Sequence, residues 1–253
     1  MKNIILTGAS SGLGKAIGEL CCINGINVIA LCRTQPNYNC QFIKTDLREE
    51  ASIINACNII KEKYNDFDAL INCAGTISME SIDKLTFKEM EEVYRVNSIA
   101  PTFIISNLLS LIIENGADIL NVASIMGTLF DIEKNSITYS ASKWAFRGAS
   151  FNLENELRDT PCRIITFNPG GMNTNLFKSY DENIEDFAKD WMNPKDIADI
   201  VLYTLNLPKQ IEITEITITR KNIQWKNKWK WILICLKVNL INWLNYVKIQ
   251  EMS

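Results

Sequence analysis

Tyr139 and Lys143 are the two residues of this sequence whose types and spacing most directly suggest chemistry. They enclose the stretch Tyr139-Ser-Ala-Ser-Lys143, and residues four apart share one face of a helix. A phenol holds its proton up to about pH 10, and a nearby ammonium favours the phenolate and lowers that pKa. The same spacing is common on solvated helix faces. The pair therefore predicts proton transfer only where the rest of the chain builds a site around it.

Composition narrows the groups that could share this chemistry. The chain has 253 residues, eight cysteines and no histidine. Ser-His-Asp triads and histidine bases are thus excluded, and without a Cys-x-x-Cys pair we expect no metal site. The cysteines lie in apolar stretches, as in a reduced cytoplasmic protein. The first apolar run leads into a glycine loop and not into a cleavage site, which also predicts a cytoplasmic location.

A glycine-rich stretch, Thr7-Gly-Ala-Ser-Ser-Gly12-Leu-Gly14, follows a predicted strand at residues 3–6 and opens a predicted helix. This order favours a phosphate-binding loop, because glycine allows close backbone approach and a helix N-terminus attracts an anion. The alternative is an ordinary strand-to-helix connection.

The second predicted strand, 26–31, ends at Cys32-Arg33. In dinucleotide-binding folds an acid at this point binds the ribose hydroxyl of NAD, whereas a basic residue accommodates the 2′-phosphate of NADP. Arg33 therefore favours NADP. NAD remains possible if Arg33 is only a surface residue.

Strands alternate with helices along the rest of the chain. Crossovers of this length predict one α/β domain over residues 1–219, with a doubly wound parallel sheet covered by helices on both faces. Pro101 marks an expected kink in one helix. The further strands are predicted at 41–45, 68–72, 117–123, 162–167 and 212–219, and the helices at 48–64, 86–115, 138–158 and from Asn193 onward.

Several motifs occur in a fixed order: Thr7-Gly-x-x-x-Gly12-x-Gly14, Asp46, Asn72-x-Ala-Gly75, Asn97, Ser124, Tyr139-x-x-x-Lys143 and Pro169-Gly170. Together they resemble the short-chain dehydrogenase/reductase family in its single-domain form. The resemblance implies a Rossmann-like sheet of about seven strands and hydride transfer between NAD(P) and a carbonyl or alcohol.

The resemblance also implies the catalytic roles. Tyr139 would protonate the carbonyl oxygen during reduction, and Ser124 would hold that oxygen. Lys143 would lower the pKa of the tyrosine and bind the nicotinamide ribose. Asn97 would hold a water that connects Lys143 to solvent.

Cofactor contacts follow from the same resemblance. Ser11 stands where many NADP-preferring members carry a basic residue, so the NADP prediction depends on Arg33. The pyrophosphate would meet Gly8, Ser10, Ser11, Gly12, Leu13 and Gly14; Asp46 and Leu47 would flank the adenine, Asn72, Ala74 and Gly75 the adenosine ribose, and Pro169, Gly170, Met172 and Thr174 the nicotinamide.

Other functions and partners remain open. A dinucleotide-binding sensor or scaffold would use the fold without chemistry, and a nucleotide-sugar-modifying enzyme would usually carry a longer C-terminal domain. Residues 175–192 lie where the family has its substrate lid, and their mixed acids and aromatics leave the substrate class unassigned. By resemblance, helices 98–115 and 138–158 would pair subunits into a homodimer or homotetramer. The expected partner is a small carbonyl or alcohol, and not a nucleic acid.

Residues 220–253 form a basic, tryptophan-rich extension. They carry seven Lys or Arg and one acid, which gives this extension a net charge of +6. Because the whole chain has a net charge of −3, residues 1–219 carry −9. On a helix their apolar residues form one stripe. Two interpretations remain open: residues 221–249 lie on an anionic membrane surface, or the stripe packs on protein.

Overall fold

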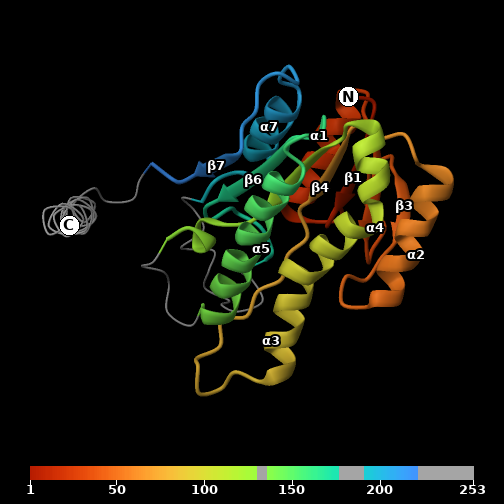
Figure 1. Ribbon diagram of the computed structural model, residues 1–253. Helices are drawn as coiled ribbons and strands as arrows, with labels where there is room; N and C mark the ends of the chain where they lie inside the picture. The colour runs from red at the N-terminus through yellow and green to blue at the C-terminus, as the bar shows by residue number, and fades with distance from the viewer. Residues whose placement is uncertain (130–135, 177–190, 222–253) are drawn as a thin grey trace, which may run out of the picture. The chain divides into compact units, whose positions relative to one another are not determined.

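Seven parallel strands form one sheet in the order β3-β2-β1-β4-β5-β6-β7 (Figure 1). The computed structural model describes residues 1–129, 136–176 and 191–221, and Met1–Thr219 form one compact unit. The strand order reverses at β1 and β4, where doubly wound folds bind dinucleotides at the carboxyl ends of the strands. The predicted fold class is confirmed. The strands are β1 (Asn3–Thr7), β2 (Asn27–Cys32), β3 (Gln41–Lys44), β4 (Ala69–Asn72), β5 (Asp118–Val122), β6 (Ile164–Pro169) and β7 (Glu215–Ile218).

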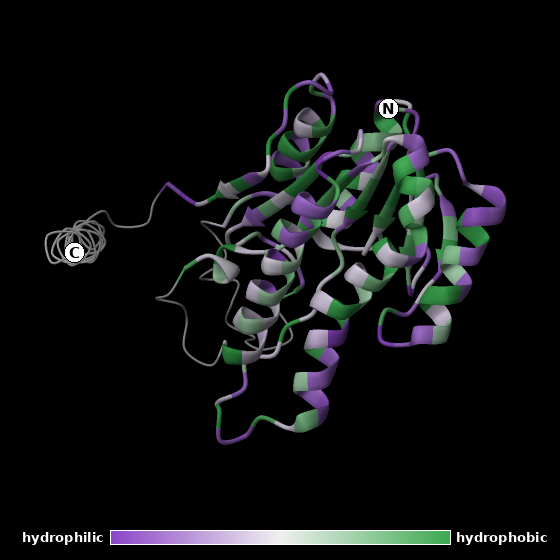
Figure 2. Ribbon diagram, viewed as in Figure 1, coloured by the Kyte–Doolittle hydropathy of each residue, from purple (hydrophilic) through white to green (hydrophobic). Residues whose placement is uncertain are grey.

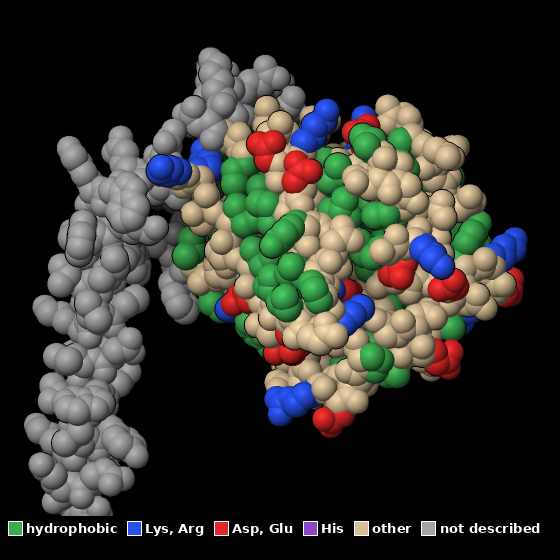
Figure 3. All heavy atoms as spheres, turned by 90° about the horizontal axis from the view of Figure 1, so that it is seen from above, with side chains coloured by type: hydrophobic (Ala, Val, Ile, Leu, Met, Phe, Trp, Pro, Cys, Tyr) green, Lys and Arg blue, Asp and Glu red, His purple; other side chains and the backbone are tan. Residues whose placement is uncertain are grey.

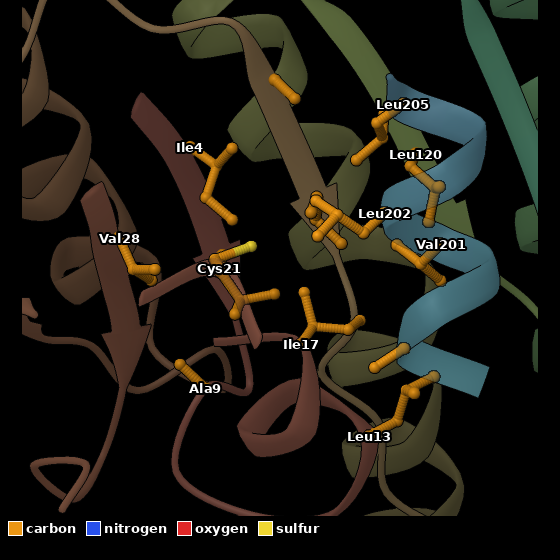
Figure 4. Packing of buried hydrophobic residues seen from close by; sticks show 14 of the residues in the cluster. Ile4, Ala9, Leu13, Ile17, Cys21, Val28, Leu120, Val201, Leu202 and Leu205 are labelled. Carbon is orange, nitrogen blue, oxygen red and sulfur yellow. The ribbon is translucent and has the colours of Figure 1, made fainter. Parts of the chain in front are cut away.

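Helices cover both faces of the sheet, so strand residues pointing either way are buried. On one face α1 packs against α7, where Ile17 and Val201 are buried (Figure 4). On the other face α2 and α4 bury Ile60 and Ile104. The central strands are accordingly hydrophobic, whereas the outer helices are mixed (Figure 2). The helices are α1 (Gly12–Ile23), α2 (Glu50–Lys63), α3 (Phe87–Tyr94), α4 (Ala100–Asn115), α5 (Ile137–Glu156) and α7 (Pro194–Leu205).

The helix expected over 86–115 is interrupted, but not at the predicted point. A π-helical turn, η1 (Arg95–Ile99), separates α3 from α4, and Pro101 lies in the first turn of α4. Proline is tolerated there because the first turn of a helix does not use its N–H groups. The whole run Phe87–Asn115 is long and apolar enough to cross a membrane by length and composition. Because Ile104, Leu108 and Ile112 of this run are core residues, we interpret it as a core helix.

A buried ion pair joins the amino-terminal ends of β5 and β6, at the edge of the sheet opposite the carboxyl ends of the strands. Arg163 Nη2 lies 2.6 Å from Asp118 Oδ2, and both side chains are almost fully buried. The same guanidinium donates hydrogen bonds to the backbone carbonyls of Leu205 and Ile211. Lys209 adds a second cation 2.6 Å from Asp118 Oδ1. This network anchors the connection from α7 to β7, because one arginine satisfies carbonyls that no strand or helix reaches.

Surface charge is mixed on the face seen from above. Acidic and basic side chains of the described residues are interspersed among apolar ones there, without a continuous field of one sign (Figure 3). A surface hollow lined by Asn115, Arg158, Arg163 and Lys209 also lies at the amino-terminal edge. Arg163 and Lys209 already bind Asp118, so we assign this hollow no role in the chemistry of the opposite edge.

Candidate active site

The glycine loop brings β1 into direct contact with the segment after β4. Gly8 has φ +71°, and a Cβ added there would lie 2.8 Å from the Cα of Ala74. Gly14 allows similar proximity, since an added Cβ would lie 2.3 Å from the carbonyl oxygen of Gly8. The Thr7 hydroxyl accepts hydrogen bonds from the backbone N–H groups of Cys73 and Ala74 at 3.0 and 3.1 Å. Only glycine fits at these two positions, because any side chain would displace backbone.

The N-terminus of α1 is suited to an anion. Its N-cap, Ser11, makes no side-chain capping hydrogen bond, and the first turn contains no acidic residue. The free N–H groups and the positive end of the helix dipole therefore face the carboxyl edge of the sheet uncompensated. The side chain of Leu13 is buried in the core, so only its backbone could contact a cofactor. These observations fit the pyrophosphate of a dinucleotide.

Tyr38 connects the segment after β2 to this glycine loop, a contact that the sequence did not reveal. Its hydroxyl donates a 3.1 Å hydrogen bond to the carbonyl oxygen of Ala9. The Tyr38 side chain packs on α1 at Gly18, where an added Cβ would lie 2.0 Å from the tyrosine oxygen. The Ser10 hydroxyl also lies near the Cys32 thiol, whose pKa it lowers against the larger effect of burial.

The adenosine end combines Arg33 with an acid that is already paired. Arg33 is exposed directly after β2, and its charge contributes to lowering the pKa of Asp46. The main cause is Arg48, which binds Asp46 through Nε at 2.9 Å and Nη2 at 2.6 Å and brings the pKa of Asp46 to about 2. Arg48 was not among the predicted site residues. The side chain of Leu47 points into the core.

The Tyr139 phenol and the Ser124 hydroxyl lie close enough to interact, and this interaction favours the phenolate. Ser124 directly precedes the short 3-10 turn η2 (Ile125–Gly127), and its oxygen also accepts from the N–H of Met126 at 3.2 Å. Tyr139 is only 5% exposed. Burial raises the pKa of its phenol, and the interaction with Ser124 only partly opposes that rise. A buried phenol that keeps its proton is suited to act as a proton donor.

Lys143 lies one turn further along α5 and is fully enclosed. Its ammonium donates a 2.9 Å hydrogen bond to the Val122 carbonyl and lies 5.9 Å from the centre of the Tyr139 ring. Burial lowers the pKa of Lys143 to about 8. Burial is the main influence on the pKa of Tyr139 in this structure, and the predicted lowering of that pKa by Lys143 stays a prediction.

Asn97 lies in the π turn and clamps two segments together. Its Nδ2 donates to the Thr76 carbonyl at 2.9 Å and to the Ser142 hydroxyl at 3.0 Å, while its Oδ1 accepts from the Thr76 N–H at 2.9 Å. Both Nδ2 hydrogens are therefore used, while Oδ1 keeps a second lone pair at which the predicted water would bind. The Asn97 carbonyl lacks the usual helical donor four residues on, because Pro101 has no N–H. That backbone oxygen and Oδ1 are the two Asn97 acceptors at which the predicted water would bind.

Three small residues position the tyrosine and lysine and were missed from the sequence. The Ser140 hydroxyl donates to the Met126 carbonyl at 2.8 Å, and the Ser142 carbonyl accepts from the Ser98 hydroxyl at 2.7 Å. Gly127 lets η2 touch α5, since an added Cβ would lie 2.8 Å from the Lys143 carbonyl oxygen. Serines inside Tyr139-Ser-Ala-Ser-Lys143 were a readable signal, but their partners are distant in sequence.

The remaining predicted residues lie around the same edge. Asn72 donates to Asn121 at 2.9 Å, and its buried Oδ1 has no partner. Gly75 is exposed, and a Cβ added there would lie 3.6 Å from Asn97 Oδ1 and 3.7 Å from Lys143 Nζ.

Thr174 lies against Gly12, whose added Cβ would be 3.4 Å from the threonine methyl. Pro169 ends β6, the Gly170 N–H binds the Ile218 carbonyl, and Met172 forms a bridge with Met192.

A parallel sheet with this strand order, a glycine cradle and a paired tyrosine and lysine defines an NAD(P)-binding oxidoreductase of Rossmann type. Residues 2–185 match the family described as short chain dehydrogenase. The chain belongs to the short-chain dehydrogenase family.

Relatives and solved structures agree with this assignment. An uncharacterized oxidoreductase of Staphylococcus saprophyticus is 29% identical over 231 residues, covering 86% of this chain and 96% of the relative. A serine dehydrogenase complexed with NADP+ shares the fold with a TM-score of 0.78 and 24% identity, covering 85% of this chain and 94% of that one. A 4-hydroxyisoleucine dehydrogenase complexed with NADH has a TM-score of 0.77 and 23% identity, covering 87% and 98%.

Proposed function

We propose that this protein is an NADP-preferring reductase that converts a carbonyl to an alcohol, with Tyr139 as general acid. The observation that carries the proposal is the buried Tyr139 phenol beside the Ser124 hydroxyl, one helical turn from the buried Lys143. Two hydroxyls that meet at the carboxyl edge of β5 could both bind one carbonyl oxygen. NADPH, held at the neighbouring glycine cradle, would supply the hydride.

Each residue of the chain has a distinct part in this mechanism. Ser124 would hold the carbonyl oxygen and stabilise the negative charge that develops on it. Tyr139 would give its proton to that oxygen as the general acid. Lys143 would bind the ribose and return a proton to Tyr139. The Asn97 carbonyl would hold the connecting water, while the Asn97 side chain fixes Thr76 and Ser142.

Arg33 supports the preference for NADP. It is exposed at the carboxyl end of β2, and the nearby Asp46 is paired with Arg48, which reduces its repulsion of a 2′-phosphate. One of the solved structures named above is complexed with NADP+ and the other with NADH, so the proposed preference depends on this chain's own residues.

Steady-state kinetics with NADPH and NADH and a panel of ketones and aldehydes would test both parts of the proposal. Arg33→Ala should raise KM for NADPH about tenfold and leave KM for NADH nearly unchanged, since one charged hydrogen-bond partner is lost. Lys61→Ala, an exposed lysine at the far end of α2, is the matched control. Equal losses with both cofactors would refute the NADP assignment. If the protein binds NADPH but reduces no carbonyl, the result would favour the alternative function, a dinucleotide-binding sensor or scaffold without catalysis.

We further propose a cytoplasmic homodimer or homotetramer joined through α4 and α5. Both helices carry partly buried apolar residues, including Phe103, Leu111 and Phe151. The extension over 221–249, proposed to touch an anionic membrane or to pack on protein, lies outside the described residues apart from Lys221. Sedimentation of the whole chain and of a 1–220 truncation, with and without anionic vesicles, would test both ideas. Unchanged vesicle binding after truncation would exclude a membrane role for the extension.

A further inference from the structure

A small apolar cluster surrounds the phenol of Tyr139. Ile77 and Met126 are buried against it, and three partly buried side chains pack on the same cluster: Met79, Ile125 and Leu176. These residues come from the segments that follow β4, β5 and β6. Three separate connections thus place hydrocarbon and thioether groups at one point. We call Met79, Ile125 and Leu176 the apolar wall.

The position of the apolar wall makes it a substrate contact. A carbonyl oxygen bound by both Ser124 and Tyr139 places its carbon, and the two groups on that carbon, within a few bond lengths of the phenol. Ile125 directly follows Ser124, and its Cδ1 lies 3.4 Å from a Cβ built on Gly170, in the segment expected at the nicotinamide. Substituents of a reacting carbonyl would therefore meet Ile125 and its neighbours.

Apart from the phenol of Tyr139, the side chains of this cluster are aliphatic or thioether groups, and none of them can pair with an ionic group. Lys143, one helical turn from Tyr139, is buried and bound to the Val122 carbonyl. A substrate carboxylate at the wall would lose its water without gaining an ionic partner, which is strongly unfavourable. An alkyl or aryl group there would be buried against methionine and aliphatic side chains, and methionine adapts to varied shapes.

We infer that the substrate is an uncharged ketone or aldehyde whose substituents are apolar, held against Met79, Ile125 and Leu176. The inference rests on the proposed reductase function and adds the substrate class. In the balanced reaction, the carbonyl compound, NADPH and one proton give the secondary or primary alcohol and NADP+. The carbonyl carbon gains the hydride, and its oxygen gains the proton of Tyr139.

The test uses the full-length protein and a matched pair of ketones, methyl 4-oxopentanoate and 4-oxopentanoate. Two methylene groups insulate the ketone from the ester or carboxylate, so the pair differs mainly in charge. We expect kcat/KM for the ester to exceed that for the acid about thirtyfold or more, the cost of an unpaired charge in an apolar site. A polyhydroxylated ketone, 1,3-dihydroxyacetone, should be a poorer substrate than cyclohexanone.

Met79→Lys places a cation on the wall and should reverse the preference. We expect it to raise kcat/KM for the acid relative to the ester at least tenfold, because the new ammonium pairs with the carboxylate. Ile23→Lys, an exposed apolar position at the end of α1, is the matched control and should change neither value. NADPH titration should give the same Kd for wild type and both variants, which shows that the cofactor site is intact.

The outcomes separate the substrate class from the reaction class. Turnover that favours the acid or 1,3-dihydroxyacetone in the wild type overturns the substrate class and leaves the reductase intact. A ratio unmoved in Met79→Lys, with NADPH binding retained, shows that the wall does not touch the substrate. Absence of NADPH oxidation with every carbonyl overturns the reductase proposal, and the substrate class with it.

Discussion

Asn97 Nδ2 donates a 3.0 Å hydrogen bond to the Ser142 hydroxyl, which joins the π turn before α4 to the helix that carries Tyr139 and Lys143. The same hydroxyl donates to the Tyr139 carbonyl at 2.7 Å. Ser142 is fully buried and Asn97 is 1% exposed, so neither partner can be replaced by water at no cost. The positions of the proposed acid and of its lysine partner therefore depend on a residue 45 positions away in the chain.

Ser142→Ala should weaken this connection. We expect kcat to fall about tenfold and the free energy of unfolding to fall by about 1–3 kcal/mol, because Asn97 loses one of its buried acceptors. Ser110→Ala, on the exposed side of α4, should change neither quantity. Kinetics and urea unfolding measure both. Wild-type kcat in Ser142→Ala would show that this hydrogen bond does not position the site.

Tyr139→Phe should remove the proton donor while preserving the shape of the site. We expect carbonyl reduction to fall about 10²–10⁴-fold, the usual contribution of a general acid. The Kd for NADPH, measured by fluorescence titration, should change less than threefold. Retention of the wild-type rate would refute the proposed role of Tyr139.

Stability at alkaline pH should depend on Lys143. Burial lowers its pKa from 10.5 to about 8, so between these values the unfolded chain binds a proton that the folded chain does not. Stability then rises as pH rises through this window, by about 2 kcal/mol from pH 8 to pH 10. Lys143→Met lacks this gain. Urea unfolding of both proteins at pH 8, 9 and 10 measures the difference, and parallel pH profiles would contradict the lowered pKa.

Gly18 and Tyr38 should be energetically coupled. Gly18→Ala forces a methyl group onto the tyrosine oxygen, so we expect destabilisation and weaker binding of both NADPH and NADH. With Tyr38→Ala also present the same change should become neutral or stabilising, since alanine favours a helix over glycine by about 1 kcal/mol. Tyr38→Phe alone should raise the cofactor Kd about fivefold through loss of the Ala9 hydrogen bond. Additive effects in the double variant would contradict the contact.

Asp118→Ala should be the most destabilising of these changes. It leaves the buried Arg163 without its carboxylate, and breaking such a pair costs about 3–5 kcal/mol. The exposed pair of Glu91 and Arg95 offers a control, because Glu91→Ala should cost less than about 1 kcal/mol. Thermal unfolding measures both. The cofactor Kd should be unchanged at low temperature, since Asp118 starts β5 at the edge opposite the site.

The local signals of the sequence were sufficient for the order of elements. Apolar runs predicted all seven strands, and Asn193-Pro194 predicted the start of α7, where the Asn193 side chain accepts from the Lys195 N–H. The break in the long helix was placed at Pro101 because proline disrupts helices. The irregular turn falls earlier, at Arg95–Ile99, where Asn97 is drawn toward Thr76 and Ser142. No local pattern encodes that partnership.

The sequence by itself determined the family, the sheet and the residues that we propose for the chemistry, since spacing within one helix or one loop defines Tyr139, Lys143 and the glycine cradle. Only the tertiary structure decided the state of those residues. Burial raises the pKa of Tyr139 and lowers that of Lys143, because desolvation depends on everything packed around a group and not on its neighbours in sequence. The apolar wall likewise exists only where three distant connections meet at the phenol.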